Sequence, residues 1–334
     1  MRSFFFLVIS AVLLVAFAVG VRAQLHPPMT DASRDAEKER YFANFTELKR
    51  FPTADSRRKA YQAAIQYLKR FEGERDPEAR VVREFVTEYE RPGRQLEILN
   101  TYRSKEYAKA FALGRVALEH DRDNFFILSV LTKAGIENAS SGNVSLNDAT
   151  LDYAKKALSL LDSGKVTKPE PFNDLNEARG ALNVALGALL REKAPVEAVQ
   201  AFRNAVQSES FYRTDPLTYH RLGIAILRGE FAQLSKEYHD KYLNQPPSPA
   251  QQEMLAKINK LGLQALDAYA RAVALSDRPE VPSETNTNVR SAKLPPEIRN
   301  KILEQLTSLY KGLHNNSEDG LKELIATVLS KPLP

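Results

Sequence analysis

The stretch YHRLGIAIL, residues 219–227, places a glycine inside a pattern that is otherwise typical of an α-helix. Tyr219, Leu222 and Ile226 are separated by three and four residues, so they share one face of a helix. Gly223 costs such a helix about 1 kcal/mol relative to alanine, so the role of a neutral spacer does not account for it. We therefore expect Gly223 to be a packing residue that lets a second helix come close.

The rest of the chain also favours helices over strands. No stretch keeps the apolar–polar alternation of a strand, and the Asp-Gly pair in EDGL at 318–321 lies within a helical pattern. Alanine, leucine, glutamate, lysine and arginine recur with turn residues about every 15 to 25 positions, which predicts about a dozen helices. Outside a central paired region, the expected helices cover 32–50, 54–71, 77–90, 297–313 and 318–330.

Capping residues and helix breakers set some of the expected boundaries. Asp55 and Asp76 carry the side-chain oxygens that accept hydrogen bonds from the first amides of a helix, and Pro77 suits the first helical turn. The RPGR stretch at 91–94 combines proline with glycine, so we expect it to break or kink the next helix.

From 94 to 276 the helical patterns recur as pairs. In YHRLGIAI, an aromatic residue precedes Leu222-Gly223 and an apolar residue follows three positions later. A second helical pattern, ALDAYARAVAL at 265–275, has Ala265 and Tyr269 four residues apart. Small residues in both helices would allow close approach of the two.

Other segments repeat the same order of positions. The segment 185–206 has Leu186-Gly187 in its first helix, and Ala198, Phe202 and Ala205 in its second. Looser copies lie at 106–124 and at 130–161.

These ordered positions resemble the tetratricopeptide repeat, a helix–turn–helix unit with the signature W-x2-L-G-x2-Y, then A-x3-F, then a closing proline. The resemblance covers 94–276, with about four pairs, and in the copy at 106–124 Gly114 replaces the large aromatic residue and Arg122 the proline. It implies an all-α, right-handed α-solenoid of stacked helix pairs. The segment 24–93 would then be the N-terminal cap region, and a linker at 277–296 would connect the repeats to a C-terminal helical pair at 297–334. An irregular bundle with small residues at its helix contacts is the alternative.

The last pair departs from the spacing of the family. The first alanine of its second helix is expected near 235, but the match falls at Ala265. The insertion, at about 229–260, contains its own predicted helix at 230–243. Ser248 and Gln251 form a capping-box pattern with Pro249 at the first helical position, so the next helix should run from about 249 to 276. Such a helix, roughly 40 Å long, could reach over the edge of the solenoid or be a tolerated surface insertion.

The first residues, MRSFFFLVISAVLLVAFAVGVRAQ, are typical of a secretory signal peptide, residues 1–23. Arg2 precedes an apolar run, and cleavage after Ala23 predicts an exported protein, periplasmic or secreted, of a bacterial type. An uncleaved segment would instead make the chain a membrane-tethered envelope assembly factor, although the run is shorter than the roughly 20 residues that span a bilayer. No later stretch reaches that length, so no membrane span is expected after cleavage.

The charge balance argues against a nucleic-acid partner. Lys and Arg number 47 against 42 Asp and Glu, a net charge of +5, and loss of Arg2 and Arg22 with the signal leaves 45 basic residues. The densest basic runs, at 47–51 and 56–62, are typical of solvated helix faces rather than of a clustered patch. Cysteine is absent, which excludes disulfides and cysteine-type zinc sites.

The sequence carries no motif for catalysis, cofactor binding or metal binding. The five histidines lack partners at metal-ligand spacing, and nucleophile-elbow, dinucleotide-binding and P-loop patterns do not occur. His239 lies beside Asp240, but adjacent residues of a helix point apart. We therefore expect no cofactor and no enzymatic activity; an enzyme with an unrecognised helical active site is the alternative.

Binding of another protein or peptide is what the resemblance implies, because stacked first helices of the family line a concave groove. Residues just before the Leu-Gly positions face that groove, which here selects Lys133 and Arg221, with His220 beside the latter and Asn183 in the pair between. Two cations would suit an acidic segment or a C-terminal carboxylate. The residue set of the family's carboxylate clamp is not reproduced, and ordinary solvated helix charge is the alternative interpretation of both cations.

Overall fold

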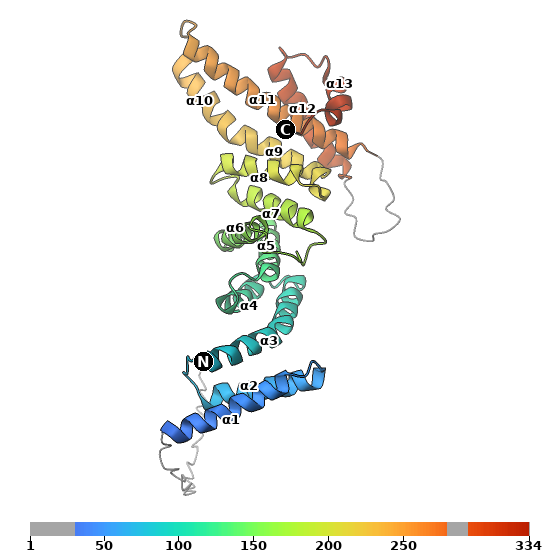
Figure 1. The fold of residues 1–334 in the computed structure, drawn as a ribbon. Coiled ribbons are helices and arrows are strands. Elements are labelled where there is room, and N and C mark those ends of the chain that lie inside the picture. The colour runs from blue at the N-terminus through green and yellow to red at the C-terminus, as the bar shows by residue number, and fades with distance from the viewer. Residues whose placement is uncertain (1–30, 279–292, 334) are drawn as a thin grey trace, which may run out of the picture. The chain divides into compact units, whose positions relative to one another are not determined.

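A computed structural model describes residues 31–278 and 293–333 (Figure 1). Within these ranges every regular element is an α- or 3₁₀-helix and no strand occurs, which confirms the predicted all-α class. None of the helices in the described ranges is long and apolar enough to cross a membrane. The predicted signal peptide and most of the predicted linker lie outside the described residues.

The chain divides into two compact units, Met1–Tyr89 and Glu90–Pro334, and each is described by itself. The boundary falls inside helix α3 (Pro77–Arg103), which also contains Pro92. Of the break or kink that we expected at 91–94, the break does not occur, because α3 continues through this stretch. Proline removes one backbone hydrogen bond from the helical ladder, and the remaining bonds continue on either side of it.

The first unit contains α1 (Asp31–Lys49), α2 (Ala54–Arg70) and the first part of α3. Its core is aromatic, because the apolar faces of these helices carry phenylalanine and tyrosine at helical spacing. The rings of Phe45 and Phe85 meet edge to face with centroids 5.1 Å apart, and those of Tyr67 and Phe71 are also 5.1 Å apart. All four residues are buried.

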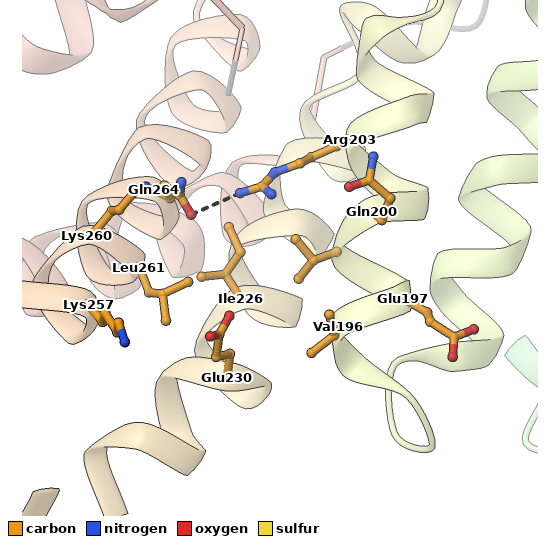
Figure 2. A pocket seen from close by; sticks show the side chains of 11 residues that line it. Val196, Glu197, Gln200, Arg203, Ile226, Glu230, Lys257, Lys260, Leu261 and Gln264 are labelled. Atoms are coloured by element: carbon orange, nitrogen blue, oxygen red, sulfur yellow. Dashed lines mark hydrogen bonds between the residues drawn. The ribbon is translucent and has the colours of Figure 1, made fainter. Parts of the chain in front are cut away.

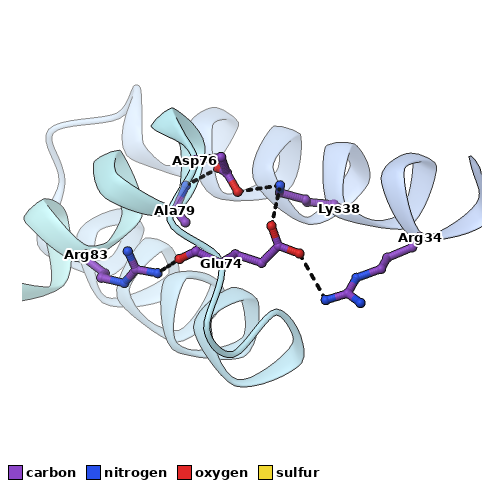
Figure 3. A network of polar contacts seen from close by, with 6 residues as sticks. All are labelled: Arg34, Lys38, Glu74, Asp76, Ala79 and Arg83. Carbon is purple, nitrogen blue, oxygen red and sulfur yellow. Dashed lines mark hydrogen bonds and ion pairs between the residues drawn. The ribbon is translucent and has the colours of Figure 1, made fainter. Parts of the chain in front are cut away.

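Caps and ion pairs join the polar ends of this unit (Figure 3). Lys38 of α1 donates to Glu74 at 3.2 Å and to Asp76 at 2.5 Å, and Asp76 also accepts from the amide of Ala79 at 2.9 Å, as its predicted capping role requires. Asp55, by contrast, does not cap α2. Thr53 does so by accepting from the amide of Ser56, because the helix already begins one residue before Asp55.

The second unit is a succession of helices, most of which pack on the next helix in the chain. Its elements after α3 are α4 (Tyr107–His120), α5 (Phe125–Ser140), α6 (Asn147–Asp162), α7 (Leu175–Leu190), α8 (Pro195–Gln207), the 3₁₀ turn η1 (Phe211–Arg213), α9 (Pro216–Arg228), α10 (Glu230–Tyr242), α11 (Pro249–Ser276), α12 (Pro296–Leu313), α13 (Leu321–Thr327) and the 3₁₀ turn η2 (Val328–Ser330).

The glycines of the predicted first helices are packing residues. A Cβ on Gly187 of α7 would lie 2.7 Å from the ring of Phe202 on α8, and a Cβ on Gly223 of α9 would lie 3.2 Å from the ring of Tyr269 on α11. In both pairs a glycine of the first helix accommodates the aromatic residue of the second. The packing role predicted for Gly223 is therefore confirmed.

The insertion has the predicted helices. α10 covers 230–242 and α11 runs for 28 residues from Pro249, with a complete capping box between Ser248 and Gln251. α9 packs more extensively on α11 than on α10. α9 and α11 therefore form the helix pair, although the insertion separates them in the chain. The N-terminal half of α11 continues past this contact and packs along α10 (Figure 1).

The C-terminal pair covers α11. Ile302 and Leu306 of α12 are buried, while the last helix starts at Leu321 rather than at 318 because Gly320 adopts a positive φ of 87°. Arg271 of α11 is only 2% exposed and donates to the carbonyl oxygens of Lys331 and Pro332 at 3.1 and 2.5 Å. This buried guanidinium holds the chain after η2 against α11.

Candidate functional site

A cleft of about 370 Å³ opens along three helices that the sequence assigns as first helices, α5, α7 and α9. We call it the α5–α9 cleft. Its lining residues are Tyr102, Ser129, Thr132, Lys133, Ile136, Glu137, Phe172, Ala181, Leu182, Val184, Ala185, Phe211, Tyr212, Asp215, Leu217 and Arg221.

Helical periodicity explains why one face of α5 forms this wall. Thr132 and Lys133 each lie three or four residues from both Ser129 and Ile136, so the four side chains leave the helix on one side. α7 contributes the apolar residues Ala181, Leu182, Val184 and Ala185, and α9 contributes Leu217 and Arg221. The cleft is thus a consequence of three parallel patterns that each repeat every three to four residues.

Two of the four predicted site residues line this cleft together. Lys133 and Arg221 occupy equivalent positions before the glycines of α5 and α9, and the fold brings both to the same cavity. The ammonium of Lys133 lies 4.6 Å from the centre of the Phe172 ring, a cation–π contact. Within the described residues, no carboxylate lies within ion-pair distance of the Arg221 guanidinium.

The two acids of the cleft are engaged by neutral donors. Glu137 accepts from the hydroxyl of Tyr102 at 2.6 Å and from that of Tyr107 at 3.1 Å. Burial, and then the bond to Glu137, raise the pKa of Tyr107. Asp215 caps α9 and accepts from the hydroxyl of Thr218 at 2.6 Å. Both carboxylates therefore have hydrogen-bond partners other than the cations.

Aromatic side chains that the sequence reasoning missed form much of the wall. Phe172 comes from the connection between α6 and α7, whereas Phe211 and Tyr212 belong to η1 and contact each other edge to face at 5.6 Å. These residues lie in connections without a helical period, so no periodic signal pointed to them. The FYR stretch just before the cap residue Asp215 was the available clue.

The other two predicted residues lie elsewhere. Asn183 is largely buried, and its amide donates to the carbonyl oxygen of Arg179 at 2.9 Å, one turn earlier on α7. His220 contacts Gln305 of α12 at 2.8 Å and its ring lies 5.6 Å from that of Tyr269. Its contacts with α12 and α11 therefore turn His220 away from the cleft, whereas Arg221, about 100° further round α9, lines it.

The described residues contain no cluster of three or more side chains of the types that hold a metal ion. Comparisons of the chain with protein-family models, with curated proteins and with solved structures gave no match. What the α5–α9 cleft binds is therefore inferred from its own residues.

Proposed function

We propose that this chain is a non-catalytic interaction protein that holds a polypeptide segment of its partner in the α5–α9 cleft. The observation that carries the proposal is the presence of Lys133 and Arg221 in one cavity with aromatic walls. Aromatic rings offer contact area to apolar side chains of a peptide, and the two cations would orient an acidic group within it.

The arrangement of the helices supports a polypeptide as the ligand rather than a compact small molecule. The cleft takes residues from three successive predicted first helices, so it extends along the series of pairs instead of closing into a single chamber. We infer that these pairs form the right-handed solenoid of tetratricopeptide-like repeats that the sequence pattern predicts. The glycine–aromatic contacts of α7 with α8 and of α9 with α11 support that inference.

We propose that this binding takes place outside the cytoplasm, because the N-terminal sequence is typical of a signal peptide. A signal peptide cleaved after Ala23 would release the chain into the periplasm or the medium. The partner would then be another envelope or secreted polypeptide with an acidic segment.

A peptide selection tests the proposal directly. The mature chain would be used to select binders from a displayed random peptide library, and their affinities would be measured by fluorescence anisotropy. The Lys133→Gln/Arg221→Gln variant should bind the selected peptides at least about tenfold more weakly, the effect of losing charge-assisted hydrogen bonds. Selected peptides should be enriched in Asp and Glu.

The control variant is Lys236→Gln/Lys241→Gln, which removes two positive charges from α10, where both side chains are exposed. Circular dichroism must show unchanged helicity for both variants. The proposal is wrong if the library yields no specific binder, or if the cleft variant binds as tightly as the control.

A further inference from the structure

A second, larger pocket lies on α8 and α11, away from the α5–α9 cleft (Figure 2). It measures about 590 Å³, which is within the range of small-molecule sites. We call it the α8–α11 pocket. Its lining residues are Val196, Glu197, Val199, Gln200, Arg203, Ile226, Glu230, Lys257, Lys260, Leu261 and Gln264.

The insertion is the reason that this pocket exists. α10 separates α9 from α11 in the sequence, and the long α11 extends past the end of α9. One helical face of α11, with Lys257, Lys260 and Gln264, then lies opposite one face of α8. The end of α9 contributes Ile226 between them, as Figure 2 shows.

The apolar part of the pocket is a continuous patch of aliphatic side chains. Val196, Val199, Ile226 and Leu261 come from three different helices and meet at the same cavity. Val196 is 60% exposed, so part of the patch is open to solvent at the pocket mouth. This surface suits an alkyl chain, whose transfer from water is favoured by burial.

The polar part has an excess of unpaired positive charge at one end. The guanidinium of Arg203 donates to the neutral amide oxygen of Gln264 at 2.9 Å, and its Nε is buried without an acceptor among the described residues. Lys257 already pairs with Glu253 at 2.7 Å, whereas Lys260 has no ion pair in the described ranges. Figure 2 shows the carboxylate of Glu230 at the opposite end of the pocket from Arg203.

We propose that the α8–α11 pocket binds a small amphipathic carboxylate, with the carboxylate on Arg203 and Lys260 and the alkyl chain over Ile226 and Leu261. A carboxylate has two acceptor atoms and matches the planar guanidinium with two parallel hydrogen bonds, which a single amide oxygen cannot do. The guanidinium would turn from Gln264 to make both bonds. This site is independent of the polypeptide cleft.

Octanoate is the probe for this proposal, with 1-octanol, octylammonium and acetate as matched compounds. Isothermal titration calorimetry on the mature chain should show saturable binding of octanoate that is at least about tenfold tighter than that of the alcohol or of acetate. Octylammonium should not bind. If 1-octanol binds as tightly as octanoate, the pocket does not recognise the anion. If acetate binds as tightly, the pocket does not use the alkyl chain. Either result overturns the proposal, and so does the absence of saturable octanoate binding.

Two pairs of variants locate the site. Arg203→Gln should weaken octanoate binding about tenfold, whereas Lys236→Gln, which removes a charge from the exposed face of α10, should leave it unchanged. Val196→Glu places a carboxylate at the pocket mouth and should weaken binding relative to the isosteric Val196→Gln. Because Val196 is exposed in the first turn of α8, where acidic residues are favourable, this second pair keeps the test valid if Arg203→Gln fails to fold. Equal affinities within both pairs would overturn the assignment.

Discussion

Gly223 of α9 lies against the ring of Tyr269 on α11, although α10 and most of α11 intervene between them in the chain. The same relationship joins Gly187 of α7 to Phe202 of α8, where the two helices are consecutive. The contact between a first-helix glycine and a second-helix aromatic residue is thus preserved across an insertion. The insertion changes what lies beside the pair without changing how the pair packs.

Alanine at Gly187 should destabilise the fold. A Cβ there would lie 2.7 to 2.8 Å from three ring atoms of the fully buried Phe202, so the overpacking should cost about 1–3 kcal/mol in the free energy of unfolding. Gly223→Ala should cost less, because its nearest ring atoms lie at 3.2 Å. Urea unfolding monitored by circular dichroism measures both. Gly312→Ala in α12 is the control: nothing lies within 4 Å, and a gain of up to about 1 kcal/mol is expected.

Replacing Arg271 with methionine should loosen the C-terminal segment. The guanidinium pairs with Asp267 at 2.7 Å and supplies the hydrogen bonds of the Lys331 and Pro332 carbonyl groups. Its removal should cost about 3 kcal/mol, because the partners keep their polarity in a buried place. Hydrogen exchange should accelerate in α13 and η2. Unchanged exchange there would contradict the anchoring role, and Arg299→Met, which breaks an exposed pair with Asp277, is the control.

The free energy of unfolding should decrease as the pH is lowered, because His220 titrates. Burial lowers the pKa of His220 from its ordinary value of 6.5, and this outweighs the hydrogen bond that the ring donates to the Gln305 side-chain oxygen, which favours the charged ring. The unfolded chain therefore binds the proton more readily, so this contribution is fully present above about pH 6.5 and is lost progressively as the pH falls below it. The free energy of unfolding of His220→Gln should depend less on pH between about 7.5 and 5. His239→Gln, at an exposed position, should behave like the native chain.

Asp76 should stabilise the first unit in two separable ways. Partial burial alone would raise the pKa of its carboxyl, but hydrogen bonds from Lys38 and from the Ala79 amide lower it to about 2. The contribution is thus present above the ordinary pKa of 3.8 and is lost as the pH falls towards 2. Asp76→Ala should cost about 1–2 kcal/mol, whereas Asp76→Asn keeps the cap and should cost less. If the two variants are equally unstable in thermal unfolding, the cap contributes nothing.

Alanine at Ser129 should raise stability. The hydroxyl is fully buried beneath the α5–α9 cleft and has no hydrogen-bond partner in the described structure, so its removal should gain about 1 kcal/mol. The neighbouring Thr132→Val is the comparison, because the Thr132 hydroxyl donates to the Leu128 carbonyl oxygen at 2.8 Å. That change should give no gain. A loss of stability in Ser129→Ala would mean that the hydroxyl is satisfied in solution.

Local patterns predicted the elements and several contacts. The helix from 249 to 276, the capping box at Ser248 and the packing role of Gly223 all follow from residues within a few turns of each other. The presence of Lys133 and Arg221 in one cleft could be predicted, because both occupy the same position of a repeated pattern. A periodic sequence thus determines which side of a helix a residue is on.

Tertiary structure decided what each side faces. His220 is one residue from Arg221, but its ring contacts Gln305 of α12, and no local pattern could predict a contact with a residue 85 positions later in the chain. Phe172, Phe211 and Tyr212 line the cleft from the connections between helices. The pocket at Arg203 forms where α11, which begins within the insertion, lies opposite α8. Helical spacing is a property of neighbouring residues, whereas burial and charge pairing depend on segments that meet only after the chain has folded.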